Sequence, residues 1–351
     1  MISAENLSKT FRVHLKEAGL KASLKALVSR KWTEKHALKN VSLKVGPGEI
    51  VGLIGANGAG KTTLVKLLAG IIHPTSGTAS VLGHTPWKRE LPFRRQIALL
   101  MGQKAQLWWD LPAGDCFLLL KEIYQLPEKQ YRENLAFLAD TLQVKNLLNV
   151  QIRRLSLGER MKMELIASLL HNPRVVFLDE PTIGLDITAQ RSIREFLLGY
   201  RKSHSPAMIL TSHYMEDIER LCERIIVIRE GEFIYDGPLR QIVRRYARHK
   251  VITAHLDKPI GASLATAPAA IPAHAGNGVE ARPAGAPTLS IGLPFAQTLV
   301  HNDEVLKVAV PKDKTVEAAA HILKSYPVID LTMEDEEITT IIESIMKDRT
   351  L

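Results

Sequence analysis

Strand-like patterns of apolar and polar residues dominate the first 54 residues of the chain. The two kinds of residue alternate weakly over residues 2–13 and cleanly over residues 41–45, which end at the turn signal Gly46-Pro47-Gly48. Residues 50–54 form a short apolar run with β-branched members, which is typical of a buried strand. The N-terminal part of the chain is therefore predicted to consist mostly of strands.

A segment inside this part has a helical pattern instead. Over residues 14–37, Leu20, Leu24, Leu27 and Val28 recur at the spacing of one helical face, and lysines and arginines surround them. A basic amphipathic helix can lie on an anionic membrane surface or against a partner helix, whereas an ordinary surface insertion would dock its leucines on the protein itself. We expect a helix here and keep both interpretations.

The central part of the chain alternates between helical and strand-like patterns. Residues 104–170 are mainly helical, and short apolar runs follow them. The expected helices are residues 116–124, 131–142, 159–170 and 187–203, and the expected strands are residues 97–101, 175–179, 208–213 and a hairpin at residues 225–235. The ends of such strands in a parallel sheet form an edge that faces ligands.

The last third of the chain has a different composition. Residues 259–294 are crowded with Ala, Pro and Gly, which favours a flexible insertion over a packed core. The expected elements around it are helices at residues 239–248, 315–326 and 334–347, and strands at residues 251–256, 305–310 and 328–331. We therefore expect a small C-terminal α+β accessory domain over residues 239–351.

Composition leaves several function classes open. The chain has 351 residues, of which 46% are hydrophobic, and a net charge of +9, which suits nucleic acid, phosphate ligands or an anionic membrane face. Cys116 and Cys222 have no metal or redox spacing, so reduced structural thiols are expected. The N-terminus lacks a signal-peptide pattern, and no apolar run approaches the ~18 residues of a membrane span. Any membrane function would therefore need a partner.

A phosphate-binding loop is the strongest chemical signal. Residues 55–62 fit the pattern G-x-x-x-x-G-K-[ST] between the expected strand 50–54 and an apolar helix. Its glycines let backbone N–H groups converge on phosphate oxygens, and the helix start adds its own N–H groups. Lys61 brings a positive charge for the β- and γ-phosphates, and the Thr62 hydroxyl can join a Mg²⁺ shell.

Polar residues follow three of the expected strands. Asp179 and Glu180 end the apolar run 175–178, where Asp179 suits Mg²⁺ and Glu180 can orient or deprotonate a water. His213 and Gln103 hold comparable positions after other strands. All four side chains are expected near the phosphate loop.

Three further features have two interpretations each. Ser156 can serve a site or act with Glu159 as an ordinary capping box at a helix start. Phe11 can stack on a nucleobase or be a buried strand residue. The pair Trp108-Trp109 lies in a loop and can belong to the core or to a docking surface.

Taken together, these motifs resemble the ATP-binding subunit of an ABC transporter over roughly residues 1–240. The matching features, in order, are residues 55–62, Gln103, residues 155–159, Asp179-Glu180, residues 184–186 and His213. The basic segment 14–37, the Trp-Trp-Asp-Leu-Pro loop at 108–112 and the form of residues 155–160 resemble the subgroup that serves multispan exporter-type permeases on separate chains. Residues 155–159 match the family's signature motif, whose common form is Leu-Ser-Gly-Gly-Gln, and here Leu157 replaces the first glycine and Glu159 the glutamine.

The resemblance implies a fold and a set of site residues. The fold is α/β, a P-loop NTPase core over residues 1–238 with an N-terminal antiparallel β-subdomain and a helical subdomain at about 104–170. The implied nucleotide-binding residues are Phe11, Gly55, Asn57, Gly58, Ala59, Gly60, Lys61, Thr62, Thr63, Ser156, Gly158 and Asp186. The implied Mg²⁺ residues are Thr62, Gln103 and Asp179, and the catalytic ones are Glu180 as general base, His213 as γ-phosphate sensor and Gln103.

The expected function is ATP hydrolysis that powers transport, in the export direction, through a multispan membrane permease. Each site would combine the loop of one chain with Ser156, Gly158 and Asp186 of another, so a homodimer or heterodimer of ATP-binding subunits is implied. We expect a peripheral location at the cytoplasmic face of the membrane and no nucleic-acid partner. A soluble ABC-type ATPase acting on ribosomes or nucleic acid and a regulatory nucleotide-binding module without turnover stay open as alternatives.

Overall fold

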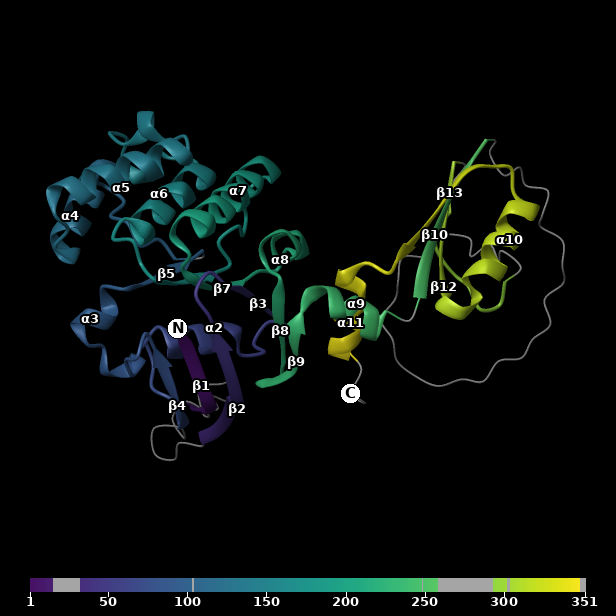
Figure 1. The fold of residues 1–351 in the computed structure, drawn as a ribbon, viewed down its shortest axis with the longest axis horizontal. Coiled ribbons are helices and arrows are strands. Elements are labelled where there is room, and N and C mark those ends of the chain that lie inside the picture. Colours follow the sequence, from purple (N-terminus) through teal and green to yellow (C-terminus); the bar gives the residue numbers. More distant parts are fainter. Residues whose placement is uncertain (15–31, 103, 248, 258–292, 302–303, 348–351) are drawn as a thin grey trace, which may run out of the picture. The chain divides into compact units, whose positions relative to one another are not determined.

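The computed structural model describes residues 1–14, 32–102, 104–247, 249–257, 293–301 and 304–347. These residues belong to two compact units, Met1–Arg240 and Gln241–Lys347, and each is described by itself. In both units, strands are sandwiched or covered by helices (Figure 1). Among the described helices, none is long and apolar enough to cross a membrane.

The first unit contains a six-stranded sheet in the order β5-β6-β7-β3-β8-β9. Its strands are β3 (Ile50–Ile54), β5 (Ile97–Met101), β6 (Val175–Asp179), β7 (Ala207–Thr211), β8 (Arg224–Arg229) and β9 (Glu232–Pro238). The first five in the sheet order pair in parallel, and β9 pairs with β8 in the antiparallel direction. Strands β3, β6 and β7 are buried throughout because both faces of this sheet are covered. The carboxyl ends of parallel strands therefore meet at one edge.

A second sheet of the same unit is antiparallel, in the order β2-β1-β4. Its strands are β1 (Ile2–His14), β2 (Trp32–Val45) and β4 (Ser76–Val81). The β1–β2 ladder continues out to the pair His14 and Trp32, so the helix expected over residues 14–37 is wrong at both of its ends. Pairing between the two strands, which a local helical spacing does not register, decides the conformation of residues 32–37. Leu20, Leu24, Leu27 and Val28 lie outside the described residues.

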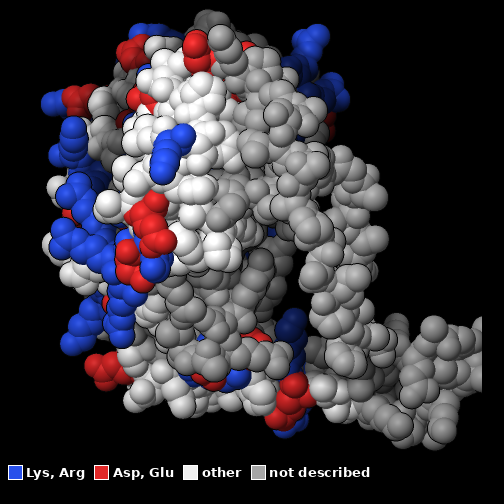
Figure 2. Space-filling model, turned by 90° about the vertical axis from the view of Figure 1, so that its right-hand side faces the viewer, with Lys and Arg blue, Asp and Glu red and all other residues white. Residues whose placement is uncertain are grey.

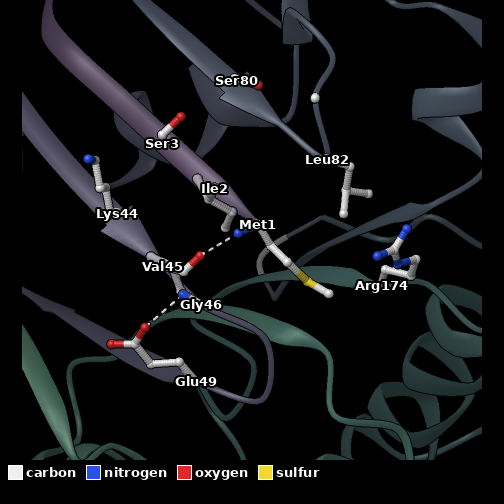
Figure 3. Close-up of a pocket in the computed structure, with 11 residues that line it drawn as sticks. Met1, Ile2, Ser3, Lys44, Val45, Gly46, Glu49, Ser80, Leu82 and Arg174 are labelled. Atoms are coloured by element: carbon white, nitrogen blue, oxygen red, sulfur yellow. Dashed lines mark hydrogen bonds between the residues drawn. The ribbon is translucent and has the colours of Figure 1, made fainter.

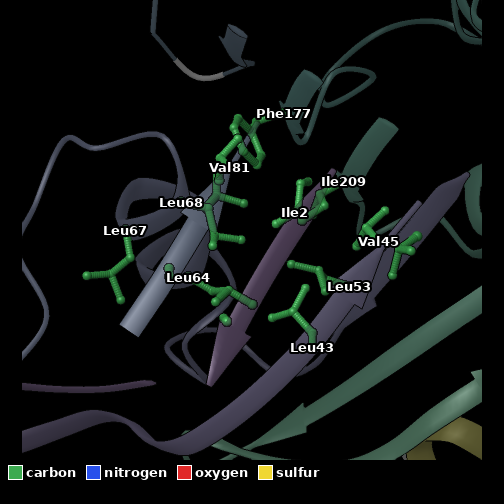
Figure 4. Packing of buried hydrophobic residues seen from close by; sticks show 14 of the residues in the cluster. Ile2, Leu43, Val45, Leu53, Leu64, Leu67, Leu68, Val81, Phe177 and Ile209 are labelled. Atoms are coloured by element: carbon green, nitrogen blue, oxygen red, sulfur yellow. The ribbon is translucent and has the colours of Figure 1, made fainter. Parts of the chain in front are cut away.

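The helix α2 (Lys61–Leu68) joins the two sheets through a common core. Leu64, Leu67 and Leu68 of α2 are fully buried. They pack in one cluster with residues of the antiparallel sheet and of the six-stranded sheet (Figure 4). The antiparallel sheet contributes Ile2, Leu43, Val45 and Val81, and the six-stranded sheet contributes Leu53, Phe177 and Ile209. This core holds the start of α2, and with it the phosphate loop, in a fixed place.

A group of helices lies beyond one edge of the six-stranded sheet (Figure 1). They are α4 (Ala113–Tyr124), α5 (Glu128–Thr141) and α6 (Leu157–Leu169), close to the expected bounds. The remaining helices of the unit are α3 (Leu91–Arg94), α7 (Ile187–His204), α8 (Met215–Leu221) and the short 3₁₀ turns Pro86–Lys88, Lys145–Leu147 and Ile152–Arg154. Cys116 and Cys222 are free and buried, and burial raises the pKa of each thiol, in agreement with structural roles.

The second unit is built on a four-stranded antiparallel sheet in the order β11-β12-β10-β13. Its strands are β10 (His249–Leu256), β11 (Gln297–His301), β12 (Val305–Pro311) and β13 (Val328–Asp335). Helix α10 (Thr315–Ser325) packs on one face through Ala318, Ala319 and Ile322. Helices α9 (Leu239–Tyr246) and α11 (Ile338–Lys347) and the 3₁₀ turn Lys312–Lys314 complete the described elements.

Two expectations for this unit are wrong in detail. Strand β11 was not predicted from the sequence pattern. The last helix begins at Ile338 and not at Glu334, because Glu334 and Asp335 pair with Val251 and Lys250 of β10 and so extend β13. The overall fold class, an α/β core with antiparallel and helical parts and a C-terminal α+β part, is confirmed.

Candidate functional site

The phosphate loop connects β3 to α2 and is closed in by neighbouring backbone. Gly60, the residue before α2, has a φ of 120°, and a Cβ atom there would lie 2.5 Å from the carbonyl oxygen of Ala37. A Cβ atom on Gly55 would lie 2.3 Å from the carbonyl oxygen of Ile228. Only glycine fits at these two positions, because the contacts are with backbone that cannot move aside.

Lys61 folds back into its own loop. Its Nζ donates hydrogen bonds to the carbonyl oxygens of Gly55 at 2.7 Å and Ala56 at 3.2 Å. The side chain is buried, and this burial lowers the pKa of the ammonium group, against the opposing effect of the negative charges of Glu180 and Asp179. The loop thus carries a positive charge directed at its own interior, as phosphate binding requires.

Asp179, at the end of β6, is held by two hydroxyl groups. Thr62 Oγ1 donates to its carboxylate at 3.0 and 3.2 Å, and Thr211 Oγ1 of β7 donates to Oδ1 at 2.6 Å. Asp179 and Thr211 are both buried. A carboxylate and a hydroxyl at this distance are the hard oxygen donors that Mg²⁺ prefers, so these residues fit that ion.

Glu180 follows with an unusual backbone conformation. Its φ is 57°, in the left-handed region, and its N–H donates to the carbonyl oxygen and the hydroxyl of Thr211 at 3.0 and 3.1 Å. On the other side, Gly102 N–H donates to the carbonyl oxygen of Asp179 at 2.8 Å, and a Cβ atom on Gly102 would lie 2.0 Å from the carbonyl oxygen of Glu180. Neighbouring strands on both sides therefore fix the direction of the Glu180 side chain.

The Glu180 side chain contacts a histidine from the next strand end. His213 Nε2 lies 2.7 Å from Glu180 Oε1. The exposed fraction is 13% for the Glu180 side chain and 38% for that of His213, so the histidine faces solvent more than the carboxylate does. Two of the three expected catalytic residues, Glu180 and His213, are thus in direct contact.

A cavity of about 260 Å³ lies beside these groups. Its lining residues are Phe11, Val13, Lys35, Ala37, Asn57, Gly58, Gly60, Lys61, Thr62, Thr63 and Glu180. Phe11 is 36% exposed, which does not agree with the buried-strand interpretation, and Lys9 Nζ lies 5.0 Å from the centre of its ring. Phe11 and the expected loop residues Asn57, Gly58, Gly60, Lys61, Thr62 and Thr63 therefore line one space, whereas Gly55 and Ala59 do not line it.

Three lining residues were missed by the sequence reasoning. Val13, Lys35 and Ala37 come from the long β1–β2 hairpin, in which Phe11 and Lys35 are direct partners. The helical spacing assigned to residues 14–37 concealed the strand in this segment. Residues 32–36 are all exposed, so no alternation of buried and exposed positions marks the strand, and only its pairing with β1 reveals it.

Gln103 lies outside the described residues, and the segment that follows it contacts α6. Glu164 Oε1 of α6 accepts the backbone N–H groups of Gln106 at 2.9 Å and Leu107 at 3.2 Å. Burial raises the pKa of this carboxyl group. The loop after Gln103 is thus attached to the helix that begins beside Ser156.

Ser156 caps α6 in a complete capping box. Its N–H and its hydroxyl donate to Glu159 Oε2 at 2.9 and 2.8 Å, and Glu159 N–H donates to Ser156 Oγ at 3.3 Å. The hydrogen bond from the Ser156 backbone lowers the pKa of Glu159. The capping interpretation of Ser156 is therefore correct within one chain. The capping hydrogen bonds also hold the Ser156 hydroxyl at the start of α6.

Asp186 lies in the same neighbourhood as this helix start. It caps α7, and its Oδ1 accepts the N–H of Ala189 at 2.9 Å. A Cβ atom on Gly158 would lie 3.1 Å from Cβ of Ala189, so the two helix starts are in contact. None of Ser156, Gly158 and Asp186 is among the described lining residues of the cavity. The expected site residues thus form two separate patches on the chain.

A larger cavity, of about 680 Å³, contains none of the expected site residues. Figure 3 shows that it lies at the beginning of β1, where Met1, Val45, Glu49 and Arg174 are among its lining residues. Two of its polar groups bond within the chain: the Met1 nitrogen donates to the Val45 carbonyl oxygen at 2.9 Å, and Gly46 N–H donates to Glu49 Oε2 at 2.8 Å. The smaller cavity, and not the larger one, therefore contains the expected site residues.

Comparison with known proteins agrees with this geometry. The family model described as "ABC transporter" matches residues 38–183. The chain is 31% identical to the ABC transporter ATP-binding protein NatA of Bacillus subtilis, over 61% of this chain and 88% of the relative. It is 34% identical to the Nod factor export ATP-binding protein I of Burkholderia thailandensis, over 62% of this chain and 70% of the relative.

Solved structures show the same fold. The structure of an ATP-binding subunit of an ABC transporter is similar with a TM-score of 0.58 and 24% identity, over 70% of this chain and 92% of the other. A dimeric ATP-binding cassette in a post-hydrolysis state, bound to ADP and Pi, is similar with a TM-score of 0.57 and 22% identity, over 68% and 99%. The chain belongs to the ATP-binding proteins of the ABC transporter family. It is the subunit that binds and hydrolyses ATP to energise transport.

Proposed function

We propose that this chain powers export through a separate multispan membrane permease, as one of two ATP-binding subunits that share their nucleotide sites. The observation that carries the proposal is the division of the motif residues into two patches, the cavity around Lys61 and the helix starts at Ser156 and Asp186. A head-to-tail two-fold dimer would bring the cavity of one chain to the second patch of the other. The dimeric form of a cassette with the same fold supports this arrangement.

The residues of the cavity would divide the work of hydrolysis. Lys61 and the loop N–H groups would bind the phosphates, and Phe11 would stack on the base. Glu180 would act as the general base on the attacking water, and His213, 2.7 Å from it, would hold its carboxylate and face the γ-phosphate. The support is that all of these groups except His213 line one cavity and that His213 contacts one of them.

Mg²⁺ is expected as the cofactor and would neutralise charge on the β- and γ-phosphates. Thr62 and Asp179 would hold it, since their oxygens lie 3.0 Å apart at the end of the phosphate loop. Thr211 would keep the carboxylate of Asp179 directed at this position. Gln103, which lies outside the described residues, is the further ligand implied by the motif order.

Exposed apolar side chains support docking of a permease on the helical part. Trp108, Trp109, Leu118, Leu119 and Ile123, from the loop before α4 and from α4 itself, are all exposed. Such a group of large apolar side chains is typical of a protein-binding surface. A permease bound there would keep the chain at the cytoplasmic face of the membrane.

The same surface connects to the second patch of the site. The guanidinium of Arg160, on α6, lies 5.1 Å from the centre of the Trp109 ring, and α6 begins at the Ser156 cap. Movement of the permease segment against Trp109 would therefore reach the residues that face the partner's nucleotide.

We also infer that residues 1–238 act as the ATP-binding domain and residues 239–351 as an accessory domain.

The shared site is tested by mixing two defective chains. Ser156→Arg blocks the second patch and Lys61→Ala weakens phosphate binding, so each variant alone should have little activity. A mixture should regain one intact composite site per mixed dimer and hydrolyse ATP measurably. A mixture that stays as inactive as its components, although mixed dimers form, would contradict the shared site.

The permease is tested by purification from detergent-solubilised membranes. A tagged wild-type chain should retain a multispan membrane protein. The double variant Trp109→Ser and Leu119→Ser should retain much less of it, whereas Val316→Ser, which changes an exposed apolar residue of α10, should behave as wild type. Equal retention by all three chains would remove this surface from the proposal.

Action on ribosomes or nucleic acid is the alternative, and it rests on the net charge of +9. In Figure 2, many of the described Lys and Arg residues lie along the left side with Asp and Glu among them, and others are scattered over the rest of the view. A nucleic-acid groove needs a continuous basic surface. The described residues in this view form no continuous basic surface, so the view does not favour the alternative over export.

A further inference from the structure

Asp217 is a buried carboxylate that the reaction described above does not use. It lies in the first turn of α8 and is fully buried. Its Oδ2 accepts a hydrogen bond from Ser212 Oγ at 2.6 Å and another from Thr182 Oγ1. Its Oδ1 lies 3.3 Å from Nε of Arg194, whose side chain is also buried.

The two hydroxyl groups belong to the two loops that carry Glu180 and His213. Thr182 stands two residues after Glu180, in the loop between β6 and α7. Ser212 stands immediately before His213, in the loop between β7 and α8, and its Oγ also accepts the N–H of Tyr214 at 3.0 Å. A single oxygen of Asp217 therefore joins the two loops whose residues Glu180 and His213 are in contact.

The chemistry makes this junction strong. Hydrogen bonds to an ionised carboxylate are stronger than those between neutral groups, and burial reduces competition from water. The nearby positive charge of Arg194 balances the buried negative charge, as a buried carboxylate requires. The junction can thus resist the tendency of Glu180 to leave its left-handed backbone conformation, which ordinarily costs energy for a residue with a side chain.

We propose that Asp217 is a positioning residue for hydrolysis, which acts by holding the Glu180 and His213 loops in register. This inference rests on the roles proposed above for Glu180 and His213. Asp217 does not line the cavity, so its removal should change the rate of hydrolysis and leave nucleotide affinity nearly intact. A displacement of a reacting group by about 1 Å can cost up to ~100-fold in rate.

The test compares Asp217→Asn, Thr182→Val and Ser212→Ala in the full chain. Each should lower kcat by roughly 10- to 100-fold, with the Kd for ATP within about twofold of wild type. Glu216→Gln is the control for the Arg194 charge, because the exposed Glu216 pairs with Arg194 while the Thr182 and Ser212 hydroxyls donate to Asp217. Thermal unfolding of every variant identifies loss of folding, and the two hydroxyl variants keep the test valid if Asp217→Asn does not fold.

Adding Ser212→Ala to the Glu180→Gln variant distinguishes a positioning role from a general loss of structure. Single-turnover hydrolysis by Glu180→Gln should fall by less than twofold when Ser212→Ala is added, because there is no general base left to position. Equal losses in both backgrounds, or a wild-type kcat for both hydroxyl variants, would overturn the role of Asp217. If Glu180→Gln itself hydrolyses at nearly the wild-type rate, the proposed role of Glu180 fails instead.

Discussion

His213 Nε2 lies 2.7 Å from Oε1 of Glu180, although the two residues follow different strands of the sheet. An imidazole N–H directed at this oxygen would orient the carboxylate next to the phosphate loop. Because β6 and β7 pair in parallel and in register up to Asp179 and Thr211, the residues after them emerge side by side. The contact is thus a consequence of sheet register.

The substitution Glu180→Gln keeps the shape of the side chain but removes the proton acceptor. Steady-state hydrolysis should fall by ~10²–10⁴-fold, the usual contribution of general base catalysis, while ATP binding stays intact. Glu195→Gln, which changes an exposed carboxylate on α7, is the control and should keep wild-type activity. A Glu180→Gln rate within threefold of wild type would assign the base to another group.

Gly102→Ala should impair hydrolysis without touching the nucleotide. The new Cβ atom would lie 2.0 Å from the carbonyl oxygen of Glu180, so β5 and the Glu180 backbone must separate. We expect kcat to fall by at least ~10-fold, since displacement of a reacting group by about 1 Å can cost far more. Gly199→Ala is the control, because a Cβ atom there meets nothing within 4 Å and alanine favours helix α7. Normal kcat in a folded Gly102→Ala chain would contradict the proposed rigidity.

Lys35→Gln should weaken nucleotide binding, because Lys35 lines the cavity beside Phe11, its direct partner on the adjacent strand. The loss should be modest, about two- to tenfold in Kd at low salt, and smaller at high salt because the side chain is exposed. Arg12→Gln is the matched control. Arg12 forms the next pair of the β1–β2 ladder with Glu34, and neither residue lines the cavity. Calorimetric titration with ATP at two salt concentrations measures both variants. The same Kd for Lys35→Gln and wild type at low salt would exclude a role for this charge.

His171 should make stability depend on pH. Burial lowers the pKa of its imidazole from 6.5 to about 4, and its Nε2 contacts the Ile97 carbonyl oxygen at 2.9 Å. Between these two values the unfolded chain binds the proton and the folded chain does not. Stability is therefore complete above pH 6.5 and falls as the pH falls toward 4, by about 2 kcal/mol at pH 5.

The measurement for His171 is urea unfolding at pH 7.5 and pH 5. The variant His171→Gln keeps a donor for the Ile97 carbonyl oxygen but cannot take up a proton in this range. It should therefore lose less stability than wild type between the two pH values. A wild-type chain whose pH dependence equals that of His171→Gln would show that this imidazole does not titrate as expected.

Much of the candidate site was predictable because its contacts are local in the chain. Lys61 bonds to Gly55 and Ala56 of its own loop, and Ser156 bonds to Glu159 within one helical turn. Such contacts depend on residue spacing alone, so a motif predicts them. The order of buried strands and helices followed from the same kind of regularity, and the fold class was correct.

The tertiary structure decided the contacts that join distant parts of the chain. Gly102 lies against Glu180, Lys35 stands opposite Phe11, and Asp217 joins the loops of Thr182 and Ser212. These contacts depend on which strands are neighbours and in which register they pair, and long-range burial of apolar side chains sets both. A local pattern cannot report a partner that lies far away in sequence, which is why residues 32–37 resembled part of a helix and are a strand.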